Sequence, residues 1–105
     1  MNMFCLRIYV HENLRLHGRL GYEWLLEEAR RQGIAGGTAF RAIAGFGRHG
    51  MLHEEHFFEL AGDLPVAVEF VVSDEEAGRL IERVRTEGVN AFYVKLPAEA
   101  GVLNG

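Results

Sequence analysis

Three of the five histidines in the chain lie close together, at His49, His53 and His56, with two glutamates between the last two. Imidazole nitrogens and carboxylate oxygens ligate transition metals, and the spacing i, i+4, i+7 would place the three rings on one side of a helix. Gly50 and the β-like residues that follow it argue against a helix here. A metal site is therefore one hypothesis, and a polar loop with scattered imidazoles is the interpretation that we favour.

The sequence contains no set of residues that matches a known arrangement for nucleophilic catalysis. The single cysteine, Cys5, falls in a predicted strand with no assigned base, and no Ser, His and Asp arrangement with a nucleophile elbow occurs. A Walker-type glycine loop with a lysine is absent, and residues 11–14 lack the arginine-bearing glycine loop of ferredoxin-like acylphosphatases. We therefore expect a protein that is not an enzyme and needs no obligatory cofactor.

The composition of the chain further limits the kinds of protein that it can be. The chain has 105 residues, 49% of them hydrophobic and 25% charged, which is typical of one globular domain over residues 1–105, with an ordered part at about 3–97. Fifteen acidic and eleven basic residues give a net charge of -4, which disfavours nucleic acid as a partner. Neither a membrane-spanning apolar run nor a signal peptide is evident, so we expect a cytoplasmic protein without membrane insertion.

The candidate residues must be positioned by six elements. Apolar alternation and Val-rich runs predict strands at 4–10, 37–46, 66–72 and 90–96. Helical spacing predicts helices at 21–32, capped by Gly33, and from the capping box Ser73 to Glu76 as far as Gly88. The order β-α-β-β-α-β predicts an α+β, ferredoxin-like sandwich, with a four-stranded antiparallel sheet and two helices on one face.

Three finer expectations concern single segments. The Val-rich run at 66–72 is typical of a strand buried on both faces. Residues 56–60 favour a short additional strand inside the loop between the second and third main strands. Trp24 lies off the apolar stripe of its helix, and we expect it to be a partly covered packing residue.

The face of the sheet opposite the helices should carry both apolar and charged side chains. The residues that we assign to it are Cys5, Arg7, Tyr9, Arg41, Ile43, Glu69, Val71, Tyr93 and Lys95. Because no predicted element remains to cover this apolar area, we expect oligomerisation to bury it. Ion pairs across the interface are the interpretation that we favour for the charged members, with a ligand site as the alternative.

Several segments together resemble the PII nitrogen-regulatory proteins. Gly33 to Thr38 runs into Gly45-Phe46-Gly47-Arg48, as a G-x-T-V strand runs into G-F-G-R in PII, and Leu64-Pro65 precedes a Val-rich strand and an acidic helix start. With residues 6–10 and His17-Gly18, the pattern is most similar to the PII-like family called domain of unknown function 190. The resemblance spans nearly the whole chain.

The resemblance implies a PII-like homotrimer and signalling function. A small anionic effector, an adenine nucleotide such as AMP, ADP or ATP, would bind in the clefts between subunits. The residues that it places at this ligand site are Thr38, Gly45, Phe46, Gly47, Arg48 and Val72. The chemistry of these residues suits an anionic ligand. Glycine at 45 and 47 lets backbone N–H groups approach an anion, and Arg48 supplies a forked donor.

Two departures from PII modify these expectations. His49-Gly50 and Thr86 to Val89 replace the lysine-bearing segments that hold phosphates in PII, so AMP or ADP should bind at least as well as ATP. The loop 48–63 contains no tyrosine, which excludes tyrosine uridylylation, and this loop would contact an unidentified protein partner. The alternative function is a trimeric divalent-metal-binding protein of the ion-tolerance type, with the loop histidines as ligands.

Overall fold

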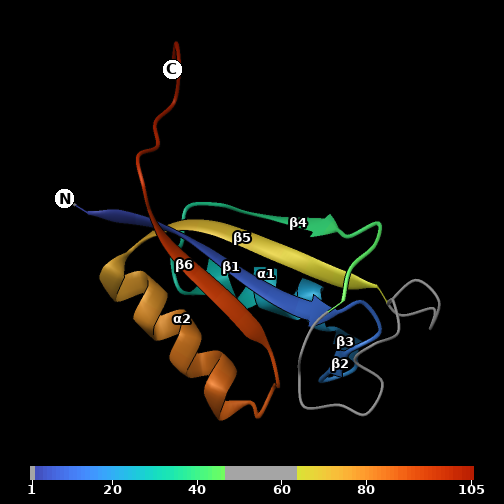
Figure 1. Ribbon diagram of the computed structural model, residues 1–105. Coiled ribbons are helices and arrows are strands. Elements are labelled where there is room, and N and C mark those ends of the chain that lie inside the picture. The colour runs from blue at the N-terminus through green and yellow to red at the C-terminus, as the bar shows by residue number, and fades with distance from the viewer. Residues whose placement is uncertain (1, 47–63) are drawn as a thin grey trace.

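A computed structural model describes residues 2–46 and 64–105, and it shows a four-stranded sheet with two long helices (Figure 1). The main elements in chain order are β1 (Met3–His11), α1 (Gly21–Arg31), β4 (Gly37–Arg41), β5 (Pro65–Ser73), α2 (Asp74–Thr86) and β6 (Phe92–Ala98). The strand order is β4-β5-β1-β6, and every neighbouring pair is antiparallel. The predicted ferredoxin-like α+β fold is confirmed.

A small hairpin between β1 and α1 was not predicted. β2 (Arg15–Leu16) pairs with β3 (Arg19–Leu20), and the two residues between them, His17 and Gly18, have φ of 52° and 78°. Positive φ at both central residues is the pattern of a type I′ turn, which matches the twist of a two-residue hairpin. Leu14, just before the hairpin, packs against the core and so holds it to the body of the domain.

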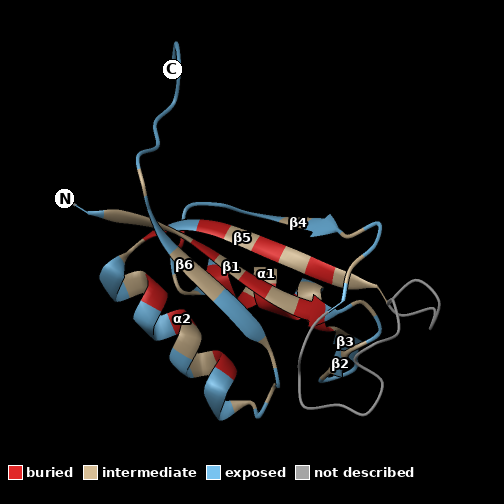
Figure 2. Ribbon diagram, in the orientation of Figure 1, coloured by how far each residue is buried: buried red, intermediate tan, exposed pale blue. Residues whose placement is uncertain are grey.

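The core lies between the sheet and the two helices, which cover the same sheet face. Four residues of β5 are at most 3% exposed and alternate with more exposed neighbours, as Figure 2 shows: Val66, Val68, Phe70 and Val72. The prediction that this strand is buried on both faces is therefore wrong. Val71 is 41% exposed, because the described residues place helices against one face only.

Trp24 is also more deeply buried than its position on the helix suggested. Its side chain is 7% exposed and belongs to the core, where α2 contributes Arg83, whose guanidinium lies 5.3 Å from the centroid of the indole ring. A residue beside the apolar stripe of α1 is thus covered by the second helix. The expectation of partial cover was wrong because it considered one helix alone.

Local sequence signals set the helix ends. The Ser73 hydroxyl accepts the N–H of Glu76 at 3.1 Å, and the Glu76 carboxylate accepts the N–H of Ser73 at 2.9 Å, which confirms the predicted capping box. Such a cap stabilises a helix by about 1 kcal/mol. Gly33 and Gly88, with φ of 91° and 75°, take the left-handed conformation just after α1 and α2.

β4 is shorter than the predicted strand at 37–46, because it ends at Arg41. It approaches the core closely at its start, where a Cβ on Gly37 would lie 2.5 Å from Cε1 of Phe70. Glycine is therefore required there for β4 to pair with β5.

The additional strand predicted at 56–60 lies outside the described residues.

The register of β6 corrects our assignment of the uncovered face. In an antiparallel pair, directly opposed residues point to the same side of the sheet. Tyr93 is opposite Ile8, Lys95 is opposite Leu6, and Arg41 is opposite Val66, all three partners being core residues. Tyr93, Lys95 and Arg41 therefore lie on the helix side. Ile43 follows the end of β4 and lies in no strand, and it is 89% exposed.

Candidate functional site

The uncovered face of the sheet carries its side chains in three rows that cross the strands. The middle row, which we call the polar row, consists of Thr38, Glu69, Arg7 and Val94. The aromatic row on one side consists of Phe40, Ala67, Tyr9 and Phe92. The aliphatic row on the other side consists of Val71, Cys5 and Leu96. Charged groups thus lie between two apolar strips, and each of the four strands contributes to the face.

An ion pair forms the centre of the polar row. Arg7 Nε donates to Glu69 Oε2 at 2.6 Å, and both side chains are about one third exposed, at 32% and 31%. Hydrogen bonding to Tyr9 and then to Glu69 raises the pKa of the Arg7 guanidinium above its ordinary value. A guanidinium has five N–H donors, so a further oxygen ligand approaching this face would meet a charged, oriented donor group.

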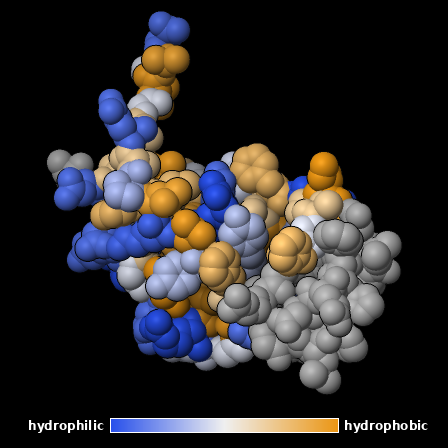
Figure 3. All heavy atoms as spheres, in the orientation of Figure 1, coloured by the Kyte–Doolittle hydropathy of each residue, from blue (hydrophilic) through white to orange (hydrophobic). Residues whose placement is uncertain are grey.

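The aromatic row offers flat apolar surface beside this donor. Tyr9 and Phe92 contact each other with ring centroids 5.8 Å apart, and Phe40 and Phe92 are 51% and 55% exposed. Figure 3 shows apolar and hydrophilic residues side by side over the sheet. Exposed rings next to a cation suit a planar group that carries an anion, because the ring stacks while the charge is paired.

Backbone contacts fix the chain on both sides of residues 47–63. Glu12 N donates to Leu64 O at 2.9 Å, Leu64 N donates to the Glu12 carboxylate at 3.3 Å, and Ala42 N donates to Pro65 O at 2.9 Å. Arg41 Nε lies 3.8 Å from the same Glu12 carboxylate, and its side chain is 61% exposed. The end of β1 and the start of β5 therefore anchor the base of the loop, with a basic side chain beside it.

The structure brings one of the predicted ligand-site residues into the polar row. Thr38 is opposite Glu69 and exposed. Val72 is fully buried on the other side of β5, at 0% exposed, so only its backbone is available to a ligand on the uncovered face. The sheet thus separates the side chains of Thr38 and Val72.

The remaining predicted ligand-site residues lie at or beyond the end of β4. Gly45 is half-buried and Phe46 is 74% exposed, and both follow the strand in the last described positions before the loop. Gly47 and Arg48 lie outside the described residues, as do the possible metal ligands His49, His53 and His56. The anion cradle and the histidine metal site both stay predictions.

Sequence reasoning missed Phe40, Phe92 and Leu96 on the uncovered face. The signal was present in β6, where Phe92, Val94 and Leu96 alternate with the more polar Tyr93 and Lys95. The more apolar set faces away from the helices, which is opposite to the usual rule for a sheet with one covered face. This reversal is itself what an interface would produce, since an interface core is depleted of charge.

A second polar cluster lies on the helix side. Arg83 of α2 pairs with Glu87 and lies 3.5 Å from Glu28, which is 5% exposed and also paired with Arg31 at 2.8 Å. His17 Nε2 contacts Glu87 Oε1 at 2.9 Å. The hydrogen bonds from Arg83 and His17 lower the pKa of Glu87. This cluster ties the hairpin β2–β3, α1 and α2 together, and we assign it a structural role.

Within residues 2–46 and 64–105, no group of three or more His, Cys, Asp or Glu side chains is placed to hold a metal ion. No described helix is both long and apolar enough to span a membrane.

Comparison with known proteins gives the family. The family model described as DUF190, an uncharacterised group, matches residues 3–94. The chain belongs to the DUF190 family. A UPF0166 protein of Aquifex aeolicus is 38% identical to this DUF190 chain over 80 residues, which cover 76% of each protein. A UPF0166 protein of Methanocaldococcus jannaschii is 33% identical over 79 residues, which cover 75% of this chain and 72% of the relative. The family predicted from the glycine motifs is thus confirmed.

Proposed function

We propose that this DUF190 protein is a PII-like regulatory protein of the cytoplasm, not an enzyme, that assembles as a homotrimer and binds a small anionic effector between its subunits. The effector that fits best is an adenine nucleotide. The single observation that carries this proposal is the polar row flanked by exposed aromatic rings on an otherwise apolar, uncovered sheet face.

Self-assembly is supported by the chemistry of that face. Phe40, Val71, Phe92 and Leu96 are 41–55% exposed and lie on the same side of one sheet. Exposed apolar strips of this kind on one face of a small domain mark an interface. Packing such faces around a threefold axis would bury the aliphatic and aromatic rows and leave clefts where the edge strands meet.

Nucleotide binding is supported by groups of β4 and β1 on the uncovered face. Thr38 and Arg7 supply a hydroxyl and a guanidinium within one row, and Phe40 supplies an exposed ring beside Thr38. The predicted Gly45 to Arg48 cradle comes after β4 in the sequence. In a cleft between subunits, an adenine ring would stack on the exposed Phe40 of the edge strand β4, while its phosphate meets the predicted cradle. The loop 48–63 would report occupancy of this site to a protein partner.

Calorimetry with AMP, ADP, ATP and adenosine tests the proposal. Arg48→Ala should weaken the three nucleotides by about ten- to hundredfold and adenosine very little, because one charge-assisted hydrogen bond contributes about 1.5–3 kcal/mol. Thr38→Val should weaken every nucleotide by several-fold. Arg79→Ala, at an exposed arginine of α2, is the matched control and should change nothing.

Two results would contradict the nucleotide site. Wild-type protein that binds none of the four probes would refute nucleotide sensing. Tight ATP binding that is equal in wild type and Arg48→Ala would show that the phosphates are held elsewhere. Robust ATP or acyl-phosphate hydrolysis that one substitution abolishes would refute the non-enzymatic assignment.

A further inference from the structure

The chain continues beyond β6 as an arm, residues 99–105, that leaves the body of the domain (Figure 1). Two aliphatic residues near its tip, Val102 and Leu103, are 84% and 89% exposed. The tip forms a turn, in which Asn104 has a φ of 59°. Asparagine tolerates this left-handed conformation, so the sequence favours the turn that presents both side chains. The arm therefore carries a small preformed apolar tip.

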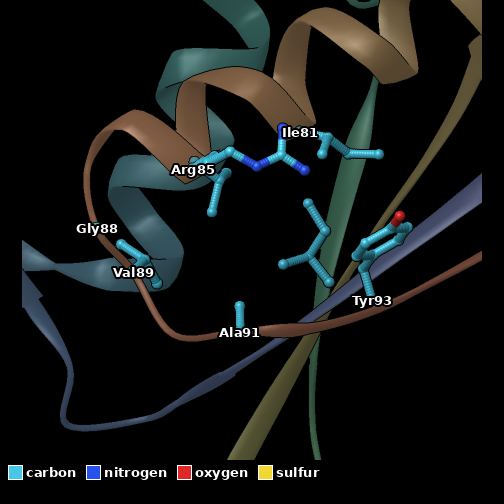
Figure 4. Close-up of a pocket in the computed structure, with 8 residues that line it drawn as sticks. Ile81, Arg85, Gly88, Val89, Ala91 and Tyr93 are labelled. Atoms are coloured by element: carbon cyan, nitrogen blue, oxygen red, sulfur yellow. The ribbon is translucent and has the colours of Figure 1, made fainter.

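An open pocket of about 300 Å³ lies at the opposite end of β6, beneath the last turns of α2 (Figure 4). Most of the residues that line it are aliphatic, namely Ile8, Ile81, Val84, Val89 and Ala91. Arg85, Gly88 and Tyr93 complete the lining. Ile8 and Val84 belong to the core, so the floor of the pocket is firmly packed. A cavity of about 150 Å³ takes up benzene, and this pocket has room for two aliphatic side chains.

Charge does not favour a small anion in this pocket. Arg85 already pairs with Glu82 at 2.6 Å, and the pocket lies at the C-terminal end of α2, where the helix dipole is negative. The proposed effector site, on the other face of the sheet, does not use it. An uncharged apolar group is the occupant that the lining selects.

The arm points away from the pocket of its own chain. It leaves from the end of β6 and runs away from the body of the domain (Figure 1), whereas the pocket adjoins the start of this strand of seven residues, which span about 20 Å. To approach its own pocket the arm would have to reverse at Ala98, and its extended length from there to Leu103, about 17 Å, only equals the distance back along β6 to Tyr93. In the direction that the structure shows, the tip meets another molecule.

We propose that the tip of the arm, Val102 and Leu103, inserts into the pocket beneath α2 of a second copy of this chain. The contact is directional, from the arm of one subunit to the pocket of the next, and such contacts close into a ring when every subunit donates one arm and accepts one. The inference rests on the proposed self-assembly and adds its partner contact. Burial of both side chains would stabilise the ring by removing their apolar surface from water.

Disulfide trapping between two differently tagged chains tests this contact. Both chains carry Cys5→Ser; one also carries Leu103→Cys and the other Val89→Cys. They are mixed at a concentration at which the wild type self-associates, and copper phenanthroline is the oxidant. The mixed disulfide should form on the order of tenfold faster or more than with an Arg79→Cys partner, since docked groups have millimolar effective concentrations. Arg79 lies on the same helix but does not line the pocket.

A variant whose pocket is filled provides the second part of the experiment. Ala91→Leu places a larger side chain in the space, so it should abolish the Leu103→Cys to Val89→Cys link, while circular dichroism shows that the fold is retained. Equal trapping at Arg79→Cys, or faster trapping with a Val71→Cys partner on the uncovered face, would refute docking in the pocket. If these chains assemble without trapping, only the arm contact fails. If sedimentation shows monomers throughout, the proposed assembly fails with it.

Discussion

Arg7 on β1 and Glu69 on β5 form an ion pair, with Nε and Oε2 2.6 Å apart, at the centre of a sheet face that no described helix covers. In the single chain both side chains are about one third exposed, so the pair contributes little to folding. In the proposed assembly, a second subunit would cover the face and bury the same pair. Its effect on assembly should therefore be much larger than its effect on the fold.

The first prediction concerns the Arg7–Glu69 pair, whose effect on assembly should exceed its effect on folding. Arg7→Met or Glu69→Met alone should weaken assembly by about 3–5 kcal/mol, because each leaves one buried charge without its partner. The double variant should recover most of the loss. Sedimentation equilibrium measures the association constant, and urea unfolding of the monomer, which should change little, is the control. Single variants that associate as tightly as the wild type would show that assembly leaves the pair in water.

The second prediction concerns the aliphatic row. Val71→Asp should dissociate the assembly, because it buries an unpaired carboxylate at the interface, while the monomer stays folded with a side chain that is already 41% exposed. Val71→Thr has a similar shape and no charge, and it should be far milder. Light scattering gives the molar mass of each variant. An unchanged mass for Val71→Asp would rule out this face as the interface.

The third prediction concerns the close approach of β4 to the core. A Cβ at Gly37 would lie 2.5 Å from Phe70 Cε1, so Gly37→Ala should destabilise the domain by about 1–3 kcal/mol through overpacking. Gly36→Ala has no atom within 4 Å of the added Cβ and serves as the matched control. Thermal unfolding of both variants measures the difference. A neutral Gly37→Ala would mean that Phe70 moves aside freely.

The fourth prediction is a pH dependence that originates at Glu28. Burial by itself would raise the pKa of this carboxyl, but the hydrogen bonds from Arg31 and Gln32 and the charges of Arg31 and Arg83 outweigh burial and lower it below the ordinary 4.5. A lowered pKa in the folded state contributes stability that is complete above the unfolded pKa and is lost as the pH falls through the folded one.

The free energy of unfolding should therefore fall as the pH decreases below about 4.5. Glu28→Gln should reduce this slope and destabilise the protein at pH 7, since Arg31 and Arg83 lose their common partner. Glu27→Gln, at the neighbouring and more exposed position, should have little effect on either. Urea unfolding between pH 3 and pH 7 supplies both measurements. Parallel pH profiles for wild type and Glu28→Gln would place the acid sensitivity elsewhere.

Local signals in the sequence determined the six main elements and their order, but not the hairpin of β2 and β3. The alternation of Leu6, Ile8 and Val10 marks β1, and the reciprocal spacing of Ser73 and Glu76 marks the start of α2. Both depend on residues a few positions apart, so they can be recognised before any tertiary contact is known. The glycine motifs around Gly33 and Gly45, with their spacing from Leu64-Pro65 and the order of the elements, indicated the family.

Only the tertiary structure decided which side chains share a face. In β6 the more apolar set, Phe92, Val94 and Leu96, would by the usual rule face the helices, and a shift of one residue in register exchanges the two sets, so the pairing of Tyr93 with Ile8 had to be observed. The row that joins Thr38, Glu69 and Arg7 likewise depends on pairings across three strands. Such pairings are set by packing of the whole sheet against the helices, which no local pattern in the chain encodes.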